Sequence, residues 1–311
     1  MPTARCIIYG GGGFIGSHIA EQLLADGISV AVFDKRQASF RNIEHIINDI
    51  DLIEGDFSNR VDLRESLKGR DHAIHLVSAT VPATSNQNPC YDVESNLIST
   101  LHLLDECSRQ KIQKVVFISS GGTVYGNPVS LPIREDHPTN PTSSYGIIKL
   151  AIEKYLNLYR HQHGLNSVVL RLANPFGERQ NPHGGQGLIA SMLYQIKHEL
   201  PVTIWGDGEV VRDYFYVKDG ARAVAKAMTY QGDFSTFNIA SGEGRSINRI
   251  LDEFRTTLGL TFAVDYLPAR RFDVTKNVLD ISLAGKELNW HPETSLELGL
   301  RRTWRHILDS K

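Results

Sequence analysis

A tyrosine and a lysine near the middle of the chain, Tyr145 and Lys149, stand four residues apart. In a helix, side chains four residues apart share a face, so this phenol and this ammonium would lie beside each other. A free tyrosine has a pKa of about 10, and a neighbouring positive charge favours its ionised form. Such a tyrosine can take a proton from a hydroxyl while a hydride leaves the same carbon. Because the spacing is common in proteins, it indicates this chemistry only beside a hydride acceptor.

Three glycines near the N-terminus, Gly10, Gly13 and Gly16, have the GxxGxxG spacing between an apolar run and a helical pattern. Glycine lets the backbone turn tightly and approach a pyrophosphate, and the following helix offers free N–H groups. Asp34 stands eighteen residues beyond Gly16, where a second apolar run ends. A carboxylate there can accept both ribose hydroxyls of NAD and would repel a 2′-phosphate. The alternatives are a tight turn with a surface aspartate, or some use of NADP because two basic residues follow Asp34.

The elements that must position these residues alternate between strands and helices. Short apolar runs predict strands over Ala4–Tyr9, Ile28–Phe33, Ala73–Val77, Val115–Ser119 and Ser167–Leu172. Helical patterns predict helices over Phe14–Asp26, Tyr91–Arg109 and Ser144–His163. This alternation predicts an α/β fold with a Rossmann-type, doubly wound parallel sheet. Such sheets bind ligands beyond the carboxyl ends of their strands, and both motifs fall there.

The pattern becomes irregular after Asn174, which indicates a second, smaller C-terminal lobe. We expect residues 1–175 to form an NAD-binding Rossmann domain, rejoined by parts of 210–240. Residues 176–311 are then mainly a substrate-binding lobe. Within that lobe, Gly206-Asp207-Gly208 predicts a hairpin turn.

The composition excludes several classes of protein. The 311 residues are 41% hydrophobic and 22% charged with a net charge of −2, so bulk charge does not favour binding to nucleic acid or an anionic membrane. No apolar run is long enough to span a membrane, and no cleavable leader precedes the first strand. The three cysteines lie in unrelated segments without metal-binding spacing, which predicts no metal site and a reducing compartment. We therefore expect a cytoplasmic enzyme.

The motifs also follow the order of a known family. The sequence resembles the extended short-chain dehydrogenase/reductase superfamily, and within it the nucleotide-sugar 4-epimerases typified by UDP-galactose 4-epimerase. The matching segments are Gly10–His18, Asp34, Asp56-Phe57, His75-Leu76, Asn96, Ser119–Gly126, Tyr145–Lys149, Arg171–Gly177, Arg212-Asp213-Tyr214 and Arg270–Asp273.

The resemblance implies a set of residues around NAD. Beyond the glycines and Asp34, these are Phe14, Ile15, Asp56, Phe57, Leu76 and Asn96, together with Tyr145 and Lys149. Asp56 could accept the adenine amino group, although taken alone it is as readily a turn residue.

On the substrate side, the resemblance implies that Arg212 and Arg270 bind the diphosphate of a sugar nucleotide, for which arginine is well suited. It places Asp273 on the nucleotide ribose and Asn174 near the diphosphate and sugar. The alternatives are an ion pair of Arg212 with Asp213 or Asp219, and an Asn-Pro turn at Asn174. Asn277 lies near the wall that limits sugar size in the family.

The chain departs from the family at two positions. A serine or threonine that binds the reacting hydroxyl in related enzymes is replaced by Gly121. Thr123 or Ser120 could supply this hydroxyl, or Tyr145 could act without it, and we expect Thr123 to do so. Its alternative role is packing or turn hydrogen bonding. The second departure is Thr80, where related epimerases often carry a lysine.

The function that the resemblance implies is NAD-dependent inversion at carbon 4 of a UDP-hexose or UDP-N-acetylhexosamine through a 4-keto sugar, in a setting such as polysaccharide biosynthesis. A nucleotide-sugar 4,6-dehydratase is an alternative, weakened because Gly122-Thr123 replaces that class's Asp-Glu pair. A reductase is another, weakened by Asp34 because many reductases use NADPH. A non-catalytic NAD-binding regulatory protein is the alternative of a different class. A homodimer through Tyr91–Arg109 and Ser144–His163 is usual in the superfamily.

Overall fold

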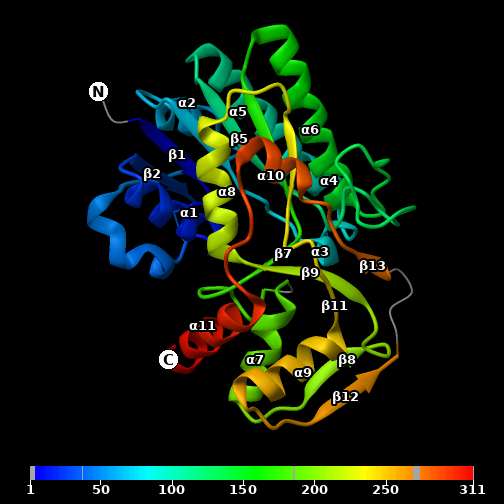
Figure 1. Ribbon diagram of the computed structural model, residues 1–311. Coiled ribbons are helices and arrows are strands. Elements are labelled where there is room, and N and C mark those ends of the chain that lie inside the picture. Colours follow the sequence, from blue (N-terminus) through cyan, green and yellow to red (C-terminus); the bar gives the residue numbers. More distant parts are fainter. Residues whose placement is uncertain (1–3, 37, 185, 269–273, 311) are drawn as a thin grey trace.

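The larger lobe of the protein is built on a seven-stranded parallel sheet (Figure 1). The computed structural model describes residues 4–36, 38–184, 186–268 and 274–310. The strands lie in the order β10-β6-β5-β4-β1-β2-β3. Their bounds are β1 (Arg5–Tyr9), β2 (Ser29–Asp34), β3 (Asp51–Glu54), β4 (His72–His75), β5 (Lys114–Ser120), β6 (Ser167–Leu172) and β10 (Thr236–Ile239). The predicted Rossmann-type α/β fold is confirmed.

Helices cover both faces of this sheet because side chains along each strand alternate between two cores. One face packs against α1 (Phe14–Ala25), α8 (Val217–Thr229) and α10 (Ser282–Leu288). The other packs against α2 (Arg60–Ser66), α5 (Ser99–Arg109) and α6 (Ser144–His163). In β1, Ile8 faces the first core and Ile7 the second.

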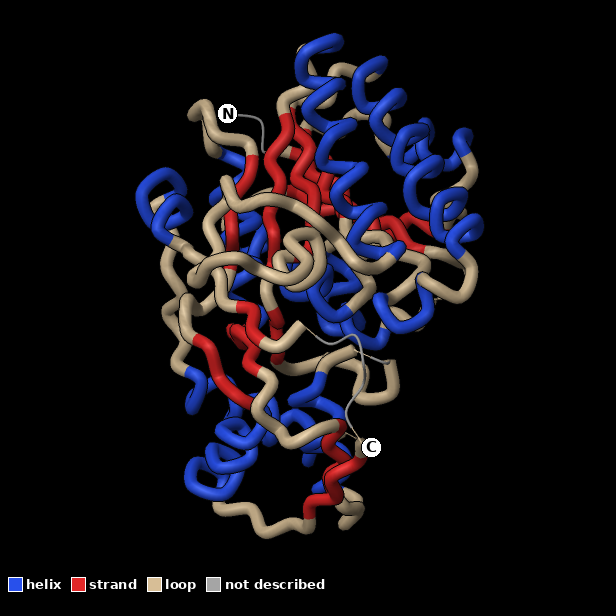
Figure 2. The backbone as a smooth tube through the Cα atoms, turned by 90° about the vertical axis from the view of Figure 1, so that its right-hand side faces the viewer, coloured by secondary structure: helices blue, strands red, loops and turns tan. Residues whose placement is uncertain are grey.

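The smaller lobe has its own core, which includes Met192, Phe254 and Leu300. Figure 2 shows the strands of the large sheet side by side in the upper lobe, with the smaller lobe below. The helices of the smaller lobe are α7 (Leu188–Lys197), α9 (Ile247–Leu258) and α11 (Leu296–Asp309). Its short strands are β7 (Asn174–Phe176), β8 (Val202–Trp205), β9 (Val211–Tyr216), β11 (Gly244–Ser246), β12 (Val264–Leu267) and β13 (Lys276–Asn277).

The hairpin predicted at Gly206-Asp207-Gly208 is wrong. The strand before it, β8, pairs in parallel with β12, whereas β9 after it pairs with β7, β11 and β13. The turn therefore leads from one sheet into another. A local glycine signal predicts the turn but carries no information about which strands pair.

The predicted helix over Tyr91–Arg109 is helical but not regular. It consists of α4 (Pro89–Asp92), a π-helical segment η2 (Val93–Ile98) and α5. Hydroxyl groups bond back to the main chain here: Ser95 donates to the Tyr91 carbonyl at 2.6 Å and Thr100 to the Asn96 carbonyl at 2.6 Å. Such bonds compete with the regular ladder and favour local widening.

Two short elements complete the larger lobe, the 3₁₀ helix η1 (Arg41–Asp49) and α3 (Pro82–Ser85). Among the described residues, no helix combines the length and the apolar character needed to cross a bilayer. The order of the sheet reverses at β1, which has β2 on one side and β4 on the other. Ligands of such sheets bind at this switch point, beyond the strand ends.

Candidate active site

The glycine turn after β1 is shaped so that only glycine fits. Gly10 has a φ of +85°, which favours glycine, and a Cβ on Gly16 would lie 2.3 Å from the Gly10 carbonyl oxygen. The Gly13 N–H donates to that same oxygen at 3.2 Å and closes the turn. Helix α1 then begins at Phe14, with Gly13 as an N-cap that has no side chain to cover the first N–H groups. The turn therefore presents backbone donors, as a pyrophosphate site requires.

The other predicted residues at the start of α1 lie in its first turn. Phe14 is half-buried, with its ring edge-on to His18 at 5.9 Å between centroids, and Ile15 packs against the first core.

Asp34 lies at the end of β2, directly beside the glycine turn. Its carboxylate accepts the Gly12 N–H at 3.2 Å and the Lys35 N–H at 2.9 Å, one on each oxygen. Burial raises the pKa of Asp34, while the two N–H groups oppose this shift. A carboxylate oxygen has more than one acceptor site, so the group can still receive the hydroxyls of a ribose.

Tyr145 and Lys149 lie on one face of α6, as predicted. The Lys149 Nζ atom is 5.6 Å from the ring centroid of Tyr145 and 4.8 Å from that of Phe117. It donates to the Ile118 carbonyl of β5 at 2.9 Å, which uses one of the three donors of an ammonium. The pair thus lies at the carboxyl end of a central strand.

Burial acts on the two groups in opposite senses. It is the larger of two causes that raise the pKa of Tyr145 to about 12, the other being the carboxylate of Asp92. It lowers the pKa of Lys149 to about 8, against the carboxylates of Glu153 and Asp92. Each group therefore favours its neutral form more than it would in water.

Side chains from a distant segment bind the first turn of α6. The Ser144 N–H donates to the Asn86 amide oxygen at 2.8 Å, and the Tyr145 N–H donates to the Ser85 hydroxyl at 3.1 Å. Ser143 is the N-cap residue and accepts from the Gly146 N–H. These bonds satisfy donors that a helix start leaves open, so they also hold the backbone of Tyr145 in place.

Asp92 is fully buried next to this turn and joins three segments. Its carboxylate accepts from the hydroxyls of Ser144 and Thr80, each at 2.6 Å, and from the Asn96 amide at 2.7 Å. The amide oxygen of Asn96 in turn accepts the Ala79 N–H at 2.8 Å. The Asn96 side chain therefore binds the main chain of the loop after β4, and the Thr80 hydroxyl donates a hydrogen bond to the buried carboxylate of Asp92.

Gly121 has no room for a side chain. A Cβ there would lie 2.5 Å from Leu279 Cδ1 and 3.2 Å from the Arg171 carbonyl oxygen. Two polar atoms near this site are buried without a hydrogen-bond partner among the described residues, Thr123 Oγ1 and Asn277 Oδ1. The Asn277 amide also donates to the Gly121 carbonyl at 3.0 Å. Such orphaned atoms cost roughly 1–3 kcal/mol each, which a ligand could offset.

The remaining residues predicted for the cofactor follow β3 and β4. Asp56 is exposed and accepts from the N–H and hydroxyl of Ser58 at 2.8 and 2.7 Å, so it forms the turn that was its alternative role. Phe57 stacks on His75 with 5.0 Å between centroids. Leu76 packs against the first core, and its N–H donates to the Tyr9 carbonyl at 3.0 Å.

The predicted substrate residues lie on paired strands at the start of the smaller lobe. Asn174 in β7 donates to the Asp213 carbonyl at 3.1 Å, and Arg212 in β9 donates to the Val211 carbonyl at 2.9 Å. Of the aspartates considered as partners for Arg212, Asp219 pairs with Arg222 at 2.6 Å. Arg270 and Asp273 lie outside the described residues.

Sequence patterns alone did not single out Ser85, Asn86 or Asp92, although all three contact the first turn of α6. They also missed Glu153, whose buried carboxylate binds the Arg171 guanidinium at 2.6 Å and so fixes α6 to β6. Glu153 follows Lys149 by four residues, and this continued helical spacing is the one signal that could have found it.

Comparison with known proteins gives a consistent picture. The model of the NAD dependent epimerase/dehydratase family matches residues 6–240. A putative UDP-glucose 4-epimerase of Methanocaldococcus jannaschii is 34% identical over 95% of this chain and 96% of its own length. A dTDP-4-dehydro-6-deoxyglucose reductase of Escherichia coli is 29% identical over 97% of this chain and 96% of its own length.

Among solved structures, UDP-glucose 4-epimerase of Thermotoga maritima with UDP-glucose superposes with a TM-score of 0.92 at 34% identity, covering 98% of each chain. The family match covers both the glycine turn and the Tyr145–Lys149 pair. This chain therefore belongs to the NAD dependent epimerase/dehydratase family.

Proposed function

We propose that this protein is an NAD-dependent 4-epimerase of a nucleotide sugar, with a UDP-hexose or UDP-N-acetylhexosamine as substrate. The observation that carries the proposal is the pair of half-buried Tyr145 and buried Lys149 at the carboxyl edge of the sheet that also holds the glycine turn. A family that includes epimerases, dehydratases and reductases shares such a pair, and the similarity to UDP-glucose 4-epimerases favours inversion.

The residues present fit NAD. A Cβ on Gly11 or Gly16 would clash with neighbouring atoms, no side chain caps the first N–H groups of α1, and Asp34 offers a carboxylate beside the turn. We assign the pyrophosphate to Gly10, Gly13 and Gly16 and the adenosine ribose to Asp34. When bound, NAD would supply the hydride acceptor for oxidation at carbon 4 of the sugar and the hydride donor for reduction from the opposite face.

The chain's own residues move the proton. Tyr145 takes the proton of the 4-hydroxyl and later returns it, as general base and then general acid. Lys149, charged and 5.6 Å from the phenol ring, favours the phenolate and has donors to spare for a ribose. Thr123 supplies a hydroxyl that has no hydrogen-bond partner among the described residues, in place of the one missing at Gly121.

We assign the substrate to the smaller lobe. Asn174 and Arg212 lie on the adjacent strands β7 and β9, where one ligand could reach both. Arg270 would also bind the diphosphate, and Asp273 would bind the nucleotide ribose. The corresponding division, residues 1–175 with parts of 210–240 for NAD and mainly 176–311 for the substrate, is part of the proposal.

Incubation with a panel of UDP-sugars, without added cofactor, tests the proposal. We expect at least one UDP-hexose or UDP-N-acetylhexosamine to be converted into its 4-epimer, detected by chromatography. The protein should carry NAD that is released into the supernatant on denaturation. Absence of any epimer, from protein that holds NAD, would exclude these substrates.

A reductase is the second candidate, because a dTDP-4-dehydro-6-deoxyglucose reductase matches almost the whole chain. A reductase consumes reduced cofactor in every turnover, whereas an epimerase consumes none. Oxidation of added NADPH or NADH by a 4-keto nucleotide sugar, with no epimerisation of UDP-sugars, would favour it.

We further propose that the protein is a homodimer. Ile147, Tyr155 and Leu158 share the outer face of α6 and are 53%, 36% and 40% exposed. An apolar face on a long helix beside α5 suits a second copy packing helix against helix. We also propose a reducing cytoplasm as its location, because Cys90 is an exposed free thiol.

A further inference from the structure

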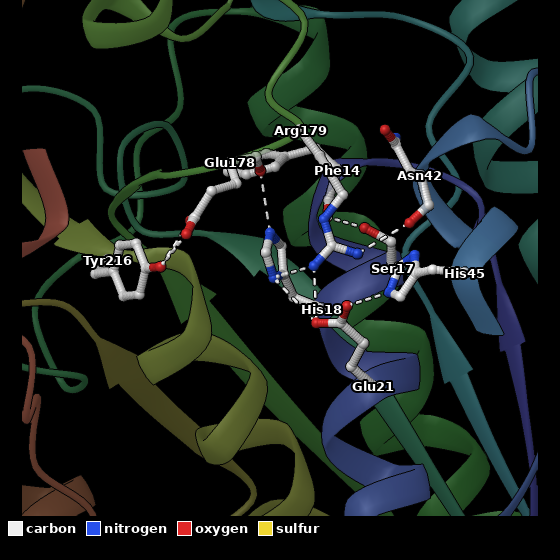
Figure 3. Close-up of polar contacts among 9 residues, drawn as sticks. All are labelled: Phe14, Ser17, His18, Glu21, Asn42, His45, Glu178, Arg179 and Tyr216. Atoms are coloured by element: carbon white, nitrogen blue, oxygen red, sulfur yellow. Dashed lines mark hydrogen bonds and ion pairs between the residues drawn. The ribbon is translucent and has the colours of Figure 1, made fainter. Parts of the chain in front are cut away.

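Arg179 lies in the loop after β7 and joins three parts of the chain (Figure 3). Its backbone is in the left-handed region, with a φ of +68°, which is uncommon for an arginine. One guanidinium nitrogen donates to the Asn42 carbonyl at 2.9 Å. The other donates to His18 Nδ1 at 2.9 Å and to Glu21 at 2.7 Å. The side chain is only 12% exposed.

Two residues of α1, His18 and Glu21, accept hydrogen bonds from the Arg179 guanidinium. His18 accepts at Nδ1, so its other nitrogen carries the proton and donates to the Glu178 carbonyl at 3.0 Å. Burial, and then the charge of Arg179, lower the pKa of His18 to about 4, so the ring stays neutral at physiological pH. The second oxygen of Glu21 binds His45. These residues form what we call the Arg179 cluster: His18, Glu21, Asn42, His45 and Arg179.

The cluster reaches the glycine turn through Asn42. While the Asn42 carbonyl accepts from Arg179, its side-chain amide donates to the Gly12 carbonyl at 3.1 Å. Phe40 lies on the same side, because a Cβ on Gly12 would be 3.3 Å from its ring and 3.1 Å from the Asp34 carboxylate. The segment 40–45 is thus held against the part of the turn that faces Asp34.

The same loop is also bound to the smaller lobe. The Glu178 carboxylate accepts the hydroxyl of Tyr216, at the end of β9, at 2.6 Å. Arg302 of α11 lies 5.6 Å from the ring centroid of Tyr216. The loop therefore links the helix of the glycine turn to the lobe that we assign to the substrate.

We propose that Arg179 is a positioning residue that slows the exchange of NAD, by holding segment 40–45 against the glycine turn and Asp34. The inference rests on the proposed NAD site, because segment 40–45 contacts the glycine turn to which we assign the pyrophosphate. An enzyme that returns its hydride to the same sugar gains from such retention, because loss of the reduced cofactor in mid-reaction would leave the enzyme without hydride.

The test measures cofactor exchange rather than turnover. Protein loaded with radiolabelled NAD is chased with excess unlabelled NAD, and the retained label is followed over time. Arg179→Gly removes the guanidinium and suits the left-handed backbone, so this variant should fold. We expect its dissociation rate for NAD to rise roughly tenfold, because three hydrogen bonds of a charged group are lost. Asn42→Ala should raise the rate by a smaller factor.

The matched control is Arg60→Ala. Arg60 also binds two carboxylates, Asp105 and Glu106, but lies on the opposite face of the sheet. Its loss should leave the dissociation rate unchanged. An unchanged rate in folded Arg179→Gly would overturn the inference and leave the proposed function intact. If Arg179→Gly does not fold, the rate in Asn42→Ala decides in its place. Wild-type protein that retains no label would instead contradict the proposed NAD site itself.

Discussion

The environment of Tyr145 and Lys149 opposes charge on both groups. With the pKa of Tyr145 raised to about 12 and that of Lys149 lowered to about 8, the protein at neutral pH holds a neutral phenol beside a mostly charged ammonium. A positively charged ring bound next to them would favour the phenolate. The tyrosine is therefore a poor base until the cofactor is present, which limits proton transfer to the loaded enzyme.

Tyr145→Phe tests the proton transfer. The change keeps the ring and the backbone bond to Ser85 but removes the acid–base group. We expect kcat to fall by roughly 10²–10⁴-fold while NAD remains bound. The measurement is the rate of epimer formation together with the NAD released on denaturation. Retention of full activity would show that another group moves the proton.

Lys149→Met tests how much the buried ammonium lowers the free energy of unfolding. A pKa lowered from 10.5 to about 8 corresponds to roughly 3 kcal/mol of folding free energy. Below pH 8 the lysine is charged in the folded and unfolded states, so the folded state bears the full cost. Between pH 8 and about 10.5, Lys149 loses its proton in the folded state but keeps it in the unfolded state. The destabilisation of the folded state therefore decreases as the pH rises.

The cofactor-free Lys149→Met protein should accordingly be more stable than wild type at pH 7, and this gain should shrink towards pH 10. Urea denaturation at several pH values measures it. A loss of stability at pH 7, or a gain that does not change with pH, would contradict this account of Lys149.

At the scale of elements, regular strands and helices follow from local sequence. The predicted bounds of β6 and α6, Ser167–Leu172 and Ser144–His163, are those of the structure. Strand β6 is apolar apart from Ser167 and Arg171, and Ser143 and Gly164 are good N-cap and C-cap residues for α6. Patterns of period 2 and 3.6 carry this information.

The bonds that place the candidate site do not follow such patterns. Ser85 and Asn86 reach the first turn of α6 across about sixty residues of chain, and Asp92 does so from an irregular helix. No periodicity links these positions. No periodicity links β8 and β12 either, which pair across about sixty residues of chain. Because of this pairing, the predicted hairpin turn instead connects two different sheets.

Gly121 shows how one element limits another. Gly121→Ser should destabilise the protein by about 1–3 kcal/mol, because the new Cβ meets Leu279 Cδ1. Leu279→Ala opens a cavity and should cost about 2–5 kcal/mol alone. In the double variant the new side chain occupies part of this cavity, so the cost should be clearly less than the sum. Urea denaturation of all four proteins measures the coupling, and strict additivity would contradict the packing described here.

At the scale of the whole molecule, the parallel sheet could be predicted because short apolar runs alternate with helical patterns, whereas the order of its strands depends on which strands pair and emerges only in the structure. The smaller lobe could be predicted only as a lobe. Three of its strands, β7, β11 and β13, have two or three residues each, too few for a pattern to emerge.

The homodimer is also a property of this scale. Ile147→Asp or Leu158→Asp places a charge on the apolar face of α6 and should shift the protein from dimer to monomer in sedimentation velocity. Val129→Asp is the matched control, because Val129 is 81% exposed but belongs to the segment between β5 and α6 rather than to the helix. Wild-type protein that sediments as a monomer would rule out this interface.

The central claim is that one enzyme-held cofactor removes a hydride from carbon 4 and returns it to the same carbon. A UDP-sugar that turns over, labelled with deuterium at carbon 4, tests this in protein that carries its own NAD and no free cofactor. The account predicts that the 4-epimer keeps its deuterium at carbon 4. Loss of the deuterium to solvent would contradict it.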